Sequence, residues 1–355
     1  MTLRPFLDRS CKLLRVRRLP LLAAVLACLG FASTASATPE FRDIVSSATA
    51  TKALAEWGGP AAATDGEIVT IYLSSTYPVD PALARQWADF MTTLIHGPEL
   101  GTVSIHLAPL AEVQRTCGVQ ALACYLPRDS AIYALGEDPR PGVSAKGVLA
   151  HEYGHHIAAS RLNPPFRSVD YGTKRWATYE DVCAKTAAGD LYPGAEDSRN
   201  YMLNPGEAFA ESYRVLNEQR LALPQEAWDI ITPSLFPDAT ALGLIEEDVL
   251  TPWEANATRR LSVKLTAKIR TRNFTLSTPY DGTLTIAPRQ SGRAKVRVSL
   301  LASGSTVGSH TLTRATGASL STTVCGQRAY RLRATLPGPV TKRTKTTLTF
   351  AISSP

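Results

Sequence analysis

The sequence predicts an α+β domain over residues 38–256 that is followed by an all-β, sandwich-like domain over residues 257–355. Two observations predict this division. Residues 38–256 carry 15 Lys and Arg against 29 Asp and Glu, whereas residues 257–355 carry 17 Lys and Arg against a single acid, Asp281. The spacing of apolar residues also changes near residue 257, from a mixture of helical and strand patterns to strict alternation. A chain of 355 residues is long enough for two hydrophobic cores.

Residues 1–37 have the pattern of a signal peptide. A basic segment leads into an apolar run from Leu19 to Ala32, and Ala35-Ser36-Ala37 forms a small-x-small cleavage site. The run is shorter than the roughly 20 residues that span a bilayer. A lipid anchor on Cys28 is the weaker alternative, because Leu26 fits that signal poorly. We therefore expect a secreted or extracytoplasmic protein that can associate with the cell surface and has no transmembrane helix after cleavage.

Four cysteines remain once the signal peptide is removed: Cys117, Cys124, Cys183 and Cys325. An even number of cysteines in an oxidising compartment predicts two disulfides. Three pairings are possible. The short spacing favours Cys117–Cys124, and this choice leaves Cys183–Cys325 as a bond between the two domains.

The beginning of the first domain is ambiguous. Residues 38–65 are either a short pro-segment or, as we prefer, a first helix that ends at Gly58-Gly59-Pro60. Clearer patterns follow it. They predict a strand over 67–74, a helix over 81–96, strands over 102–107 and 130–135, and a mostly loop-like stretch over 162–200. A further helix is expected to begin at Asn204-Pro205, because Asn is a good N-cap and Pro suits the first turn.

The second domain is predicted from short alternating runs that are separated by turn residues. Turn signals lie at Asp281-Gly282, Ser291-Gly292 and Pro337-Gly338. About seven short strands over this length are typical of a β-sandwich. The runs cover residues 261–269, 283–287, 295–300, 329–336 and 346–352.

The strongest chemical signal is His151-Glu152-Tyr-Gly-His155. On a helix, positions i and i+4 share one face, so both histidines can reach one metal ion while Glu152 holds a water beside it. This arrangement is the core of a catalytic zinc site, provided that a third ligand leaves one position open. His156 points about 100° away from His155 and is expected to pack or to support the site. His96 and His106 lack partners at ligand spacing and are expected to be surface or packing residues.

The third ligand is expected to be an acid. Glu207 and Glu211 lie one turn apart on the same helical face, and Asp170 is the runner-up. Glu207 has an alternative role in a capping box with Asn204, in which its carboxylate bonds back to the cap. Glu211 has two alternative roles, as a solvated carboxylate or as a partner of a ligand histidine.

The pair of motifs resembles the gluzincin zinc metallopeptidases. His151-Glu-Tyr-Gly-His155 is followed by Asn204-x-x-Glu207-x-Phe-Ala-Glu211-x-x-Arg214, which is similar to the second zinc helix of the lethal-factor-like members. The resemblance implies a zincin-like metallopeptidase domain in which Glu207 is the third Zn²⁺ ligand and Glu211 supports the site. It also implies a tyrosine that stabilises the transition state. Tyr201 is the nearest match, with Tyr213 and Tyr171 as alternatives.

The expected activity is that of an exported zinc-dependent endopeptidase that hydrolyses peptide bonds. Zinc held by His151, His155 and Glu207 would activate a water, Glu152 would act as the general base, and Tyr201 would stabilise the oxyanion. The alternative is a surface-binding protein whose zinc site is structural or degenerate.

The charge of residues 257–355 predicts an anionic partner in addition to a protein or peptide substrate. We expect an anionic cell-surface polymer, with lipid headgroups and nucleic acid as alternatives. Few aromatic residues are present for base stacking, so specific nucleic-acid recognition is not expected. A further possibility is that this basic domain docks on the acidic first domain.

Overall fold

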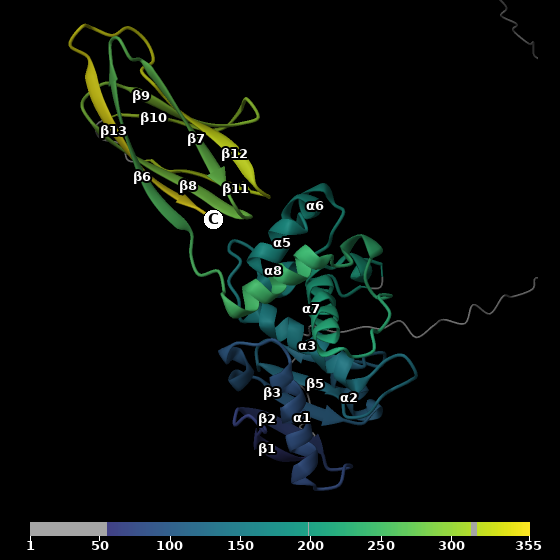
Figure 1. Ribbon diagram of the computed structural model, residues 1–355. Coiled ribbons are helices and arrows are strands. Elements are labelled where there is room, and N and C mark those ends of the chain that lie inside the picture. Colours follow the sequence, from purple (N-terminus) through teal and green to yellow (C-terminus); the bar gives the residue numbers. More distant parts are fainter. Residues whose placement is uncertain (1–54, 198, 314–317) are drawn as a thin grey trace, which may run out of the picture. The chain divides into compact units, whose positions relative to one another are not determined.

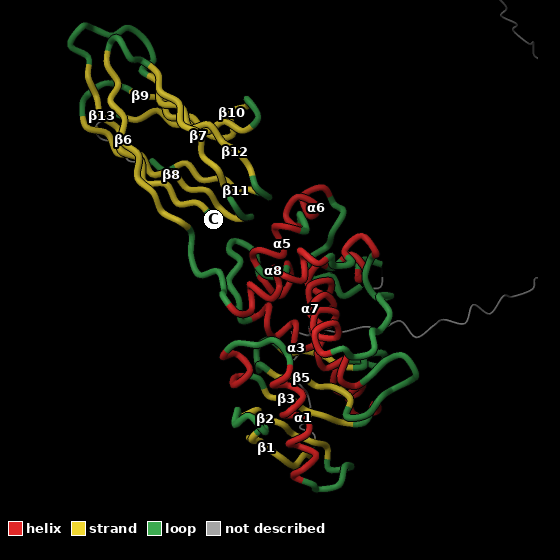
Figure 2. The backbone as a smooth tube through the Cα atoms, viewed as in Figure 1, coloured by secondary structure: helices red, strands yellow, loops and turns green. Residues whose placement is uncertain are grey.

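The computed structural model describes residues 55–197, 199–313 and 318–355. The first part of the described chain is a mixed α/β arrangement around a five-stranded sheet, and the last part consists of two four-stranded sheets (Figure 1). Figure 2 shows the change from helices and strands to strands alone after the last helix, α8 (Ala239–Leu250). The predicted signal peptide, and the residues up to Leu54 that were expected in a first helix, lie outside the described residues.

The five-stranded sheet has the strand order β1-β2-β3-β5-β4. Strands β2, β3 and β5 are parallel, and β1 and β4 pair antiparallel at the two edges. The strands predicted over 67–74, 102–107 and 130–135 are thereby confirmed as β2, β3 and β5. The bounds of the five are β1 (Glu56–Ala62), β2 (Ile68–Ser74), β3 (Ser104–Ala108), β4 (Ala123–Leu126) and β5 (Ala131–Leu135).

The helix end expected at Gly58-Gly59-Pro60 is wrong, because these residues lie within β1. Gly58 has φ +115°, and a Cβ atom at this position would lie 2.4 Å from the carbonyl oxygen of Ile71. The glycine therefore permits a close approach of β1 to β2 rather than a chain reversal. Pro60 is tolerated because β1 is an edge strand, where a missing amide hydrogen need not leave a neighbouring strand unpaired.

Helices α1 (Pro81–Thr93), α2 (Leu110–Cys117) and α3 (Ala145–Ala159) pack against this sheet. The first of them begins at Asp80, whose carboxylate accepts a hydrogen bond of 2.9 Å from the amide of Ala82. It ends slightly earlier than predicted, because Leu94 is already extended. A short 3-10 helix, η1 (Pro98–Thr102), leads into β3. The core between helices and sheet consists of fully buried apolar side chains, including Val69, Ile71, Leu73, Met91, Ile105 and Leu149.

The stretch over 162–200 is mostly loop, as predicted, but it also contains three short helices that the sequence did not predict. None exceeds two turns, so none shows the apolar periodicity from which a helix is predicted. Tertiary contacts hold them instead: the carboxylate of Asp248 accepts hydrogen bonds from the amides of Arg175 and Trp176. The three helices are α4 (Ser168–Tyr171), α5 (Lys174–Tyr179) and α6 (Val182–Ala188). After them come η2 (Tyr201–Leu203), α7 (Pro205–Leu221) and η3 (Pro233–Leu235).

Residues after Ala257 form β-sandwich-like sheets with the strand orders β10-β9-β12-β7 and β11-β8-β13-β6. Their apolar side chains build a hydrophobic core that shares no residue with the core of the first sheet. The domain boundary at residue 257 itself stays a prediction. The strands are β6 (Ala257–Thr266), β7 (Thr271–Thr278), β8 (Gly282–Ser291), β9 (Val296–Ala302), β10 (Ser305–Leu312), β11 (Leu320–Val324), β12 (Arg328–Thr335) and β13 (Lys345–Ser354).

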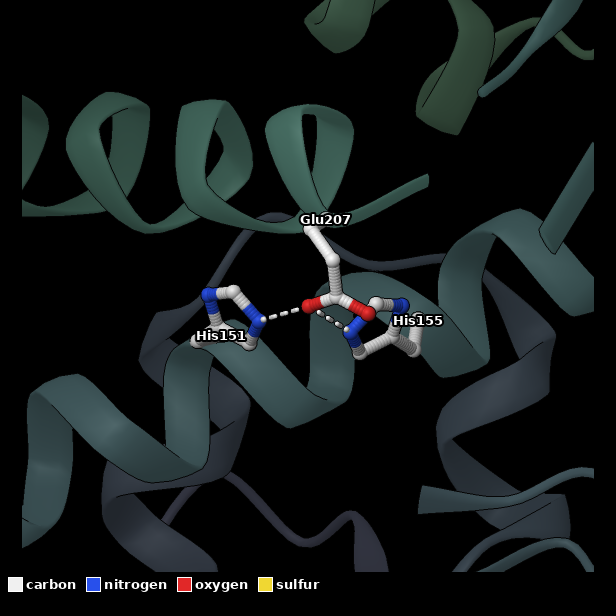
Figure 3. Close-up of side chains that lie close together, drawn as sticks. All are labelled: His151, His155 and Glu207. Atoms are coloured by element: carbon white, nitrogen blue, oxygen red, sulfur yellow. Dashed lines mark hydrogen bonds and ion pairs between the residues drawn. The ribbon is translucent and has the colours of Figure 1, made fainter. Parts of the chain in front are cut away.

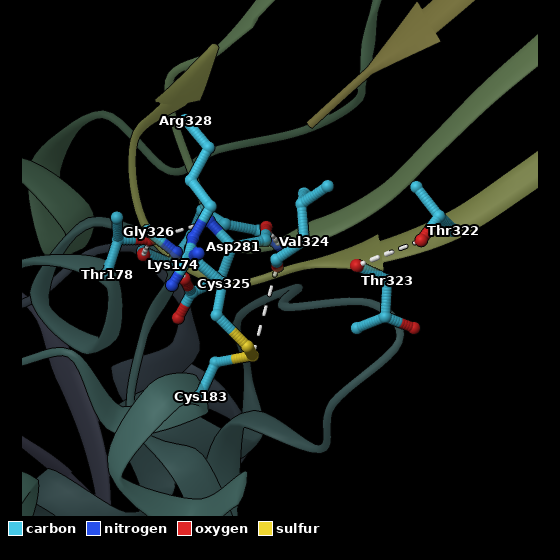
Figure 4. Close-up of a disulfide and its surroundings, with 10 residues drawn as sticks. All are labelled: Lys174, Thr178, Cys183, Asp281, Thr322, Thr323, Val324, Cys325, Gly326 and Arg328. Carbon is cyan, nitrogen blue, oxygen red and sulfur yellow. Dashed lines mark hydrogen bonds between the residues drawn. A yellow bond between two sulfur atoms is a disulfide. The ribbon is translucent and has the colours of Figure 1, made fainter. Parts of the chain in front are cut away.

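Both predicted disulfides, Cys117–Cys124 and Cys183–Cys325, are present. The second joins α6 to the turn between β11 and β12, as Figure 4 shows. Beside it, Nζ of the buried Lys174 donates to the carbonyl of Asp281 at 3.0 Å, and the amide of Asp281 donates to Thr178 Oγ1 at 2.9 Å. Asp281, the only acid after residue 257, is itself buried at this junction.

Among the described residues, no helix combines the length and the apolar character that a membrane span requires.

Candidate metal centre

Helix α3 carries the two histidines of the motif on one buried face. The helix begins at Ser144, whose hydroxyl accepts a hydrogen bond of 2.9 Å from the amide of Gly147. His151 is 1% exposed and His155 is fully buried. Glu152, which follows His151 on the same helix, is 1% exposed as well. These three polar side chains are buried. Burying polar groups costs free energy unless they are paired, so a buried cluster of this kind indicates a functional site.

Helix α7 packs closely on α3, and a glycine sets the distance. A Cβ atom at Gly154 would lie 2.8 Å from the Cα atom of Ala210, so only a glycine permits this approach without a shift. The helix begins at Asn204, whose side chain accepts from the amide of Gly206 at 3.0 Å. The capping-box role proposed for Glu207 is not what the structure shows, because its carboxylate faces the histidines instead.

His151, His155 and Glu207 form a buried group that could hold a metal ion (Figure 3). The Oε2 atom of Glu207 lies 3.3 Å from Nε2 of His151 and 3.2 Å from Nε2 of His155. One potential ligand atom from each side chain lies within 4.8 Å of the others. Burial raises the pKa of Glu207, but the two histidines outweigh this and hold it below its usual range. The carboxylate is therefore ionised, as a metal ligand must be.

Two imidazole nitrogens and one carboxylate oxygen match the ligand sets of catalytic zinc sites that have three protein ligands. The residues present therefore fit a divalent ion of this type. Asp170, the runner-up for the third ligand, does not belong to the group. Its carboxylate pairs with Arg167 at 3.1 Å.

Glu211 lies behind His151 rather than in the metal-binding group. Its Oε2 atom is 2.8 Å from Nδ1 of His151. An ionised carboxylate at this distance holds the proton on Nδ1, so that Nε2, on the side of Glu207, carries the lone pair with which a metal ion would be bound. Burial raises the pKa of Glu211, yet the hydrogen bonds from His151 and Arg214 lower it to about 2. Glu207 is thus the acid that completes the metal-binding group, and Glu211 is the partner of a histidine in that group.

Arg214 is the last residue of the second motif, and the sequence analysis gave it no role. Its Nε atom donates to Oε2 of Glu211 at 3.0 Å, and its guanidinium also pairs with Glu218. All three side chains are almost fully buried. The spacing of Glu211 and Arg214, three residues apart on one helix, is the signal that could have indicated the pair.

Tyr201 is the tyrosine nearest to the group. Its hydroxyl donates to Oε2 of Glu207 at 3.0 Å, and its side chain is 5% exposed. Tyr213, one of the two alternatives, donates instead to the carbonyl of Ile95. The other, Tyr171, stacks on Phe166 with ring centroids 4.6 Å apart. Of the three candidates, only Tyr201 has a described hydrogen bond to the His-His-Glu group.

The remaining histidines lie outside the group. His156 contacts the hydroxyl of Tyr125 through Nδ1 at 3.0 Å, and burial lowers its pKa. His106 stacks between Tyr72 and Tyr133. Nε2 of His96 lies 3.7 Å from the carboxylate of Glu67.

Two cavities border the group. One, of about 560 Å³, is lined by Glu207 together with Arg128, Arg167, Asp170 and Glu196. The other, of about 220 Å³, is lined by His151 and Glu211, among other residues. The lining of the first cavity is mostly polar and charged next to Glu207.

Comparisons with known proteins give no family. No family model and no curated protein match the chain. Among solved structures, the chain is similar to PliG of Aeromonas hydrophila, a periplasmic inhibitor of g-type lysozyme, at 13% identity and a TM-score of 0.20, over 28% of this chain and 86% of that one. It is also similar to the carbohydrate-binding module CBM36 in complex with calcium and xylotriose, at 15% identity and a TM-score of 0.18, over 28% and 92%. At these scores the likeness carries no argument.

Proposed function

We propose that the protein is a zinc-dependent endopeptidase of the gluzincin type. One observation carries the proposal: His151 and His155 from α3 and Glu207 from α7 converge in a buried group. Among the described residues this group has three members, a number that leaves a coordination position for water or substrate. A structural zinc site normally fills all four positions with protein ligands. The resemblance of the two helices to gluzincin motifs agrees with the catalytic interpretation.

Each side chain has a defined task in the proposed reaction. Zinc bound in such a site acts as a Lewis acid and lowers the pKa of water from about 15.7 towards 7. Glu152 accepts the proton of the attacking water and delivers it to the leaving amine. Tyr201, already within 3.0 Å of Glu207, donates a hydrogen bond to the oxyanion that develops on the peptide carbonyl. Glu211 keeps His151 in the tautomer that binds metal.

Export belongs to the same proposal. The two disulfides are consistent with an oxidising compartment. The amino-terminal segment over residues 1–37 has the pattern of a signal peptide. We further propose that residues 257–355 bring the enzyme to an anionic surface, because they carry 17 Lys and Arg against one acid.

The decisive experiment compares the mature protein with Glu152→Gln on a mixture of unfolded proteins, with cleavage sites mapped by mass spectrometry. We expect cleavage by the parent protein, and a loss of at least about a hundredfold in the variant. Glu246→Gln is the matched control, because Glu246 is exposed on α8 and remote in sequence from the motif. Metal content is measured for all three proteins.

The alternative is a surface-binding protein with a structural or degenerate zinc site. Equal cleavage by parent protein and Glu152→Gln, or no cleavage by zinc-loaded protein, would favour this alternative. An X-ray absorption spectrum that shows a fourth protein ligand on the bound zinc would also favour this alternative.

A further inference from the structure

The surface of the sandwich-like sheets is almost free of side-chain carboxylates. Sixteen Lys and Arg lie in the described part of residues 257–355. The only acid, Asp281, is 1% exposed and accepts a hydrogen bond from the amide of Gly326. None of the ion pairs of the described chain joins one of these basic side chains to an acid before residue 257. The positive charge therefore faces solvent.

Three loops lie together at one end of the two sheets. Each loop connects a strand of one sheet to a strand of the other. The loops are 267–270 between β6 and β7, 292–295 between β8 and β9, and 336–344 between β12 and β13. The register agrees, because Lys345 pairs with Thr266, and Thr347 with Ser291. Figure 1 shows these loops at the end of the sheets away from the C-terminus.

Most of the charge of this region gathers at that end. We call the cluster the cationic tip. It contains nine of the sixteen described basic residues, all exposed: Lys268, Arg270, Arg272, Arg293, Lys295, Arg297, Lys342, Arg343 and Lys345. The opposite end, which holds Asp281 and Cys325, is covered by the junction with α5 and α6. The sandwich is thus charged asymmetrically along its length.

Apolar groups project from the tip between the charges. Ile269 is 38% exposed between two basic neighbours. A tight turn fixes it, since the amide of Thr266 donates to its carbonyl at 2.9 Å and its own amide donates to Thr266 Oγ1 at 3.1 Å. The 336–344 loop adds the exposed Pro339. Arg270 ties the two loops together by donating to the carbonyl of Leu336 at 3.2 Å.

We propose that the cationic tip docks on the surface of an anionic lipid bilayer, with Ile269 at the boundary between headgroups and acyl chains. An end of the sheets that combines exposed basic side chains with the exposed Ile269 can place several charges on a flat anionic surface at once. An extended polymer would instead run along a face or a groove. The proposal deepens the anionic-surface part of the proposed function and does not depend on catalysis.

The test uses the mature full-length chain and vesicles of phosphatidylcholine, alone or mixed with phosphatidylglycerol. We expect sedimentation with the mixed vesicles only. A tip variant replaces Lys268, Arg293, Lys342 and Arg343 by Gln, all exposed and without described hydrogen bonds or ion pairs. Each removed cation lowers partitioning about fivefold, so the tip variant loses a hundredfold or more. The matched control replaces Arg260, Lys264, Arg289 and Arg331 by Gln. These residues lie within β6, β8 and β12 rather than in the three loops, and we expect a loss of less than tenfold.

Ile269→Ser separates the apolar contribution from charge, with an expected loss of several-fold that persists at high salt. Glu152→Gln binds vesicles as the parent protein does, so failure of the enzymatic proposal would not affect this measurement. Equal losses in the tip and control variants would overturn the proposal, since net charge alone would then act. Binding to soluble polyphosphate without binding to vesicles would also overturn the proposal, and would identify an anionic polymer as the partner.

Discussion

Oε2 of Glu211 lies 2.8 Å from Nδ1 of His151, at the opposite side of the ring from the nitrogen that faces Glu207. The contact fixes the ring and its tautomer before any ion arrives. Glu211→Gln keeps the size of the side chain but removes its charge. We expect the affinity for Zn²⁺ to fall about 10- to 100-fold, measured by competition with a chromophoric chelator. Glu246→Gln should bind zinc as the parent protein does, and an equal loss there would contradict this role.

The backbone contact between Gly154 and Ala210 predicts a second effect. Gly154→Ala places a methyl group 2.8 Å from the Cα atom of Ala210, so α3 and α7 must separate. We expect a loss of about 1–3 kcal/mol in the free energy of unfolding, measured with urea. Zinc affinity should fall as well, because the ligands come from both helices.

Gly243→Ala on α8 is the matched control. A Cβ atom there meets nothing within 4 Å, so the substitution should stabilise the protein by up to about 1 kcal/mol. Similar destabilisation by both substitutions would show that the close approach of α3 and α7 is not what Gly154 provides.

Lys174 predicts a pH dependence at the junction with Asp281. Burial lowers the pKa of Lys174 to about 8 from a model-compound value of 10.5. As the pH rises above 8, the folded state releases this proton before the unfolded state does, so stability rises with pH. The free energy of unfolding should rise by about 1.5 kcal/mol between about pH 8 and pH 9.5. Unfolding in urea across this range should show it, whereas Lys174→Met should remove the slope.

The two disulfides should differ in their contributions to stability. Cys183–Cys325 closes a loop with a sequence separation of 142, against 7 for Cys117–Cys124. Chain-entropy arguments assign about 5 kcal/mol to the long loop and about 2 kcal/mol to the short one. Paired Cys→Ser variants, followed by thermal unfolding, should therefore show the larger decrease in Tm for the long loop. The reverse order would point to residual structure in the unfolded chain.

The parts of the candidate site that the sequence predicted are those that depend on one helix at a time. Spacing alone places His151 and His155 on one face of α3, and Asn204-Pro205 marks the start of α7. Spacing cannot distinguish Glu207 from Glu211, because both lie on the same face. Only the packing at Gly154 decides that Glu207 meets both histidines while Glu211 meets one.

The fold was predicted least well where tertiary contacts override local signals. Gly58 was interpreted as part of a helix end, but its role is to let β1 approach the carbonyl of Ile71. The helix over 174–179 was missed because its amides are held by Asp248, which lies far away in the sequence. After residue 257, alternation located β6, β8, β9, β12 and β13, most of whose buried residues follow a period of two. It did not locate β7, β10 or β11, and β10 is exposed along almost its whole length.

The burial of Asp281 has a consequence for how the sheets after residue 257 respond to their surroundings. Surfaces that mix acids and bases change their net charge as carboxylates gain protons in mildly acidic conditions. Here the only side-chain carboxylate, that of Asp281, is buried, and Lys and Arg keep their charge at acidic and neutral pH. The attraction of this region to anions should therefore not weaken on acidification, whereas added salt should weaken it.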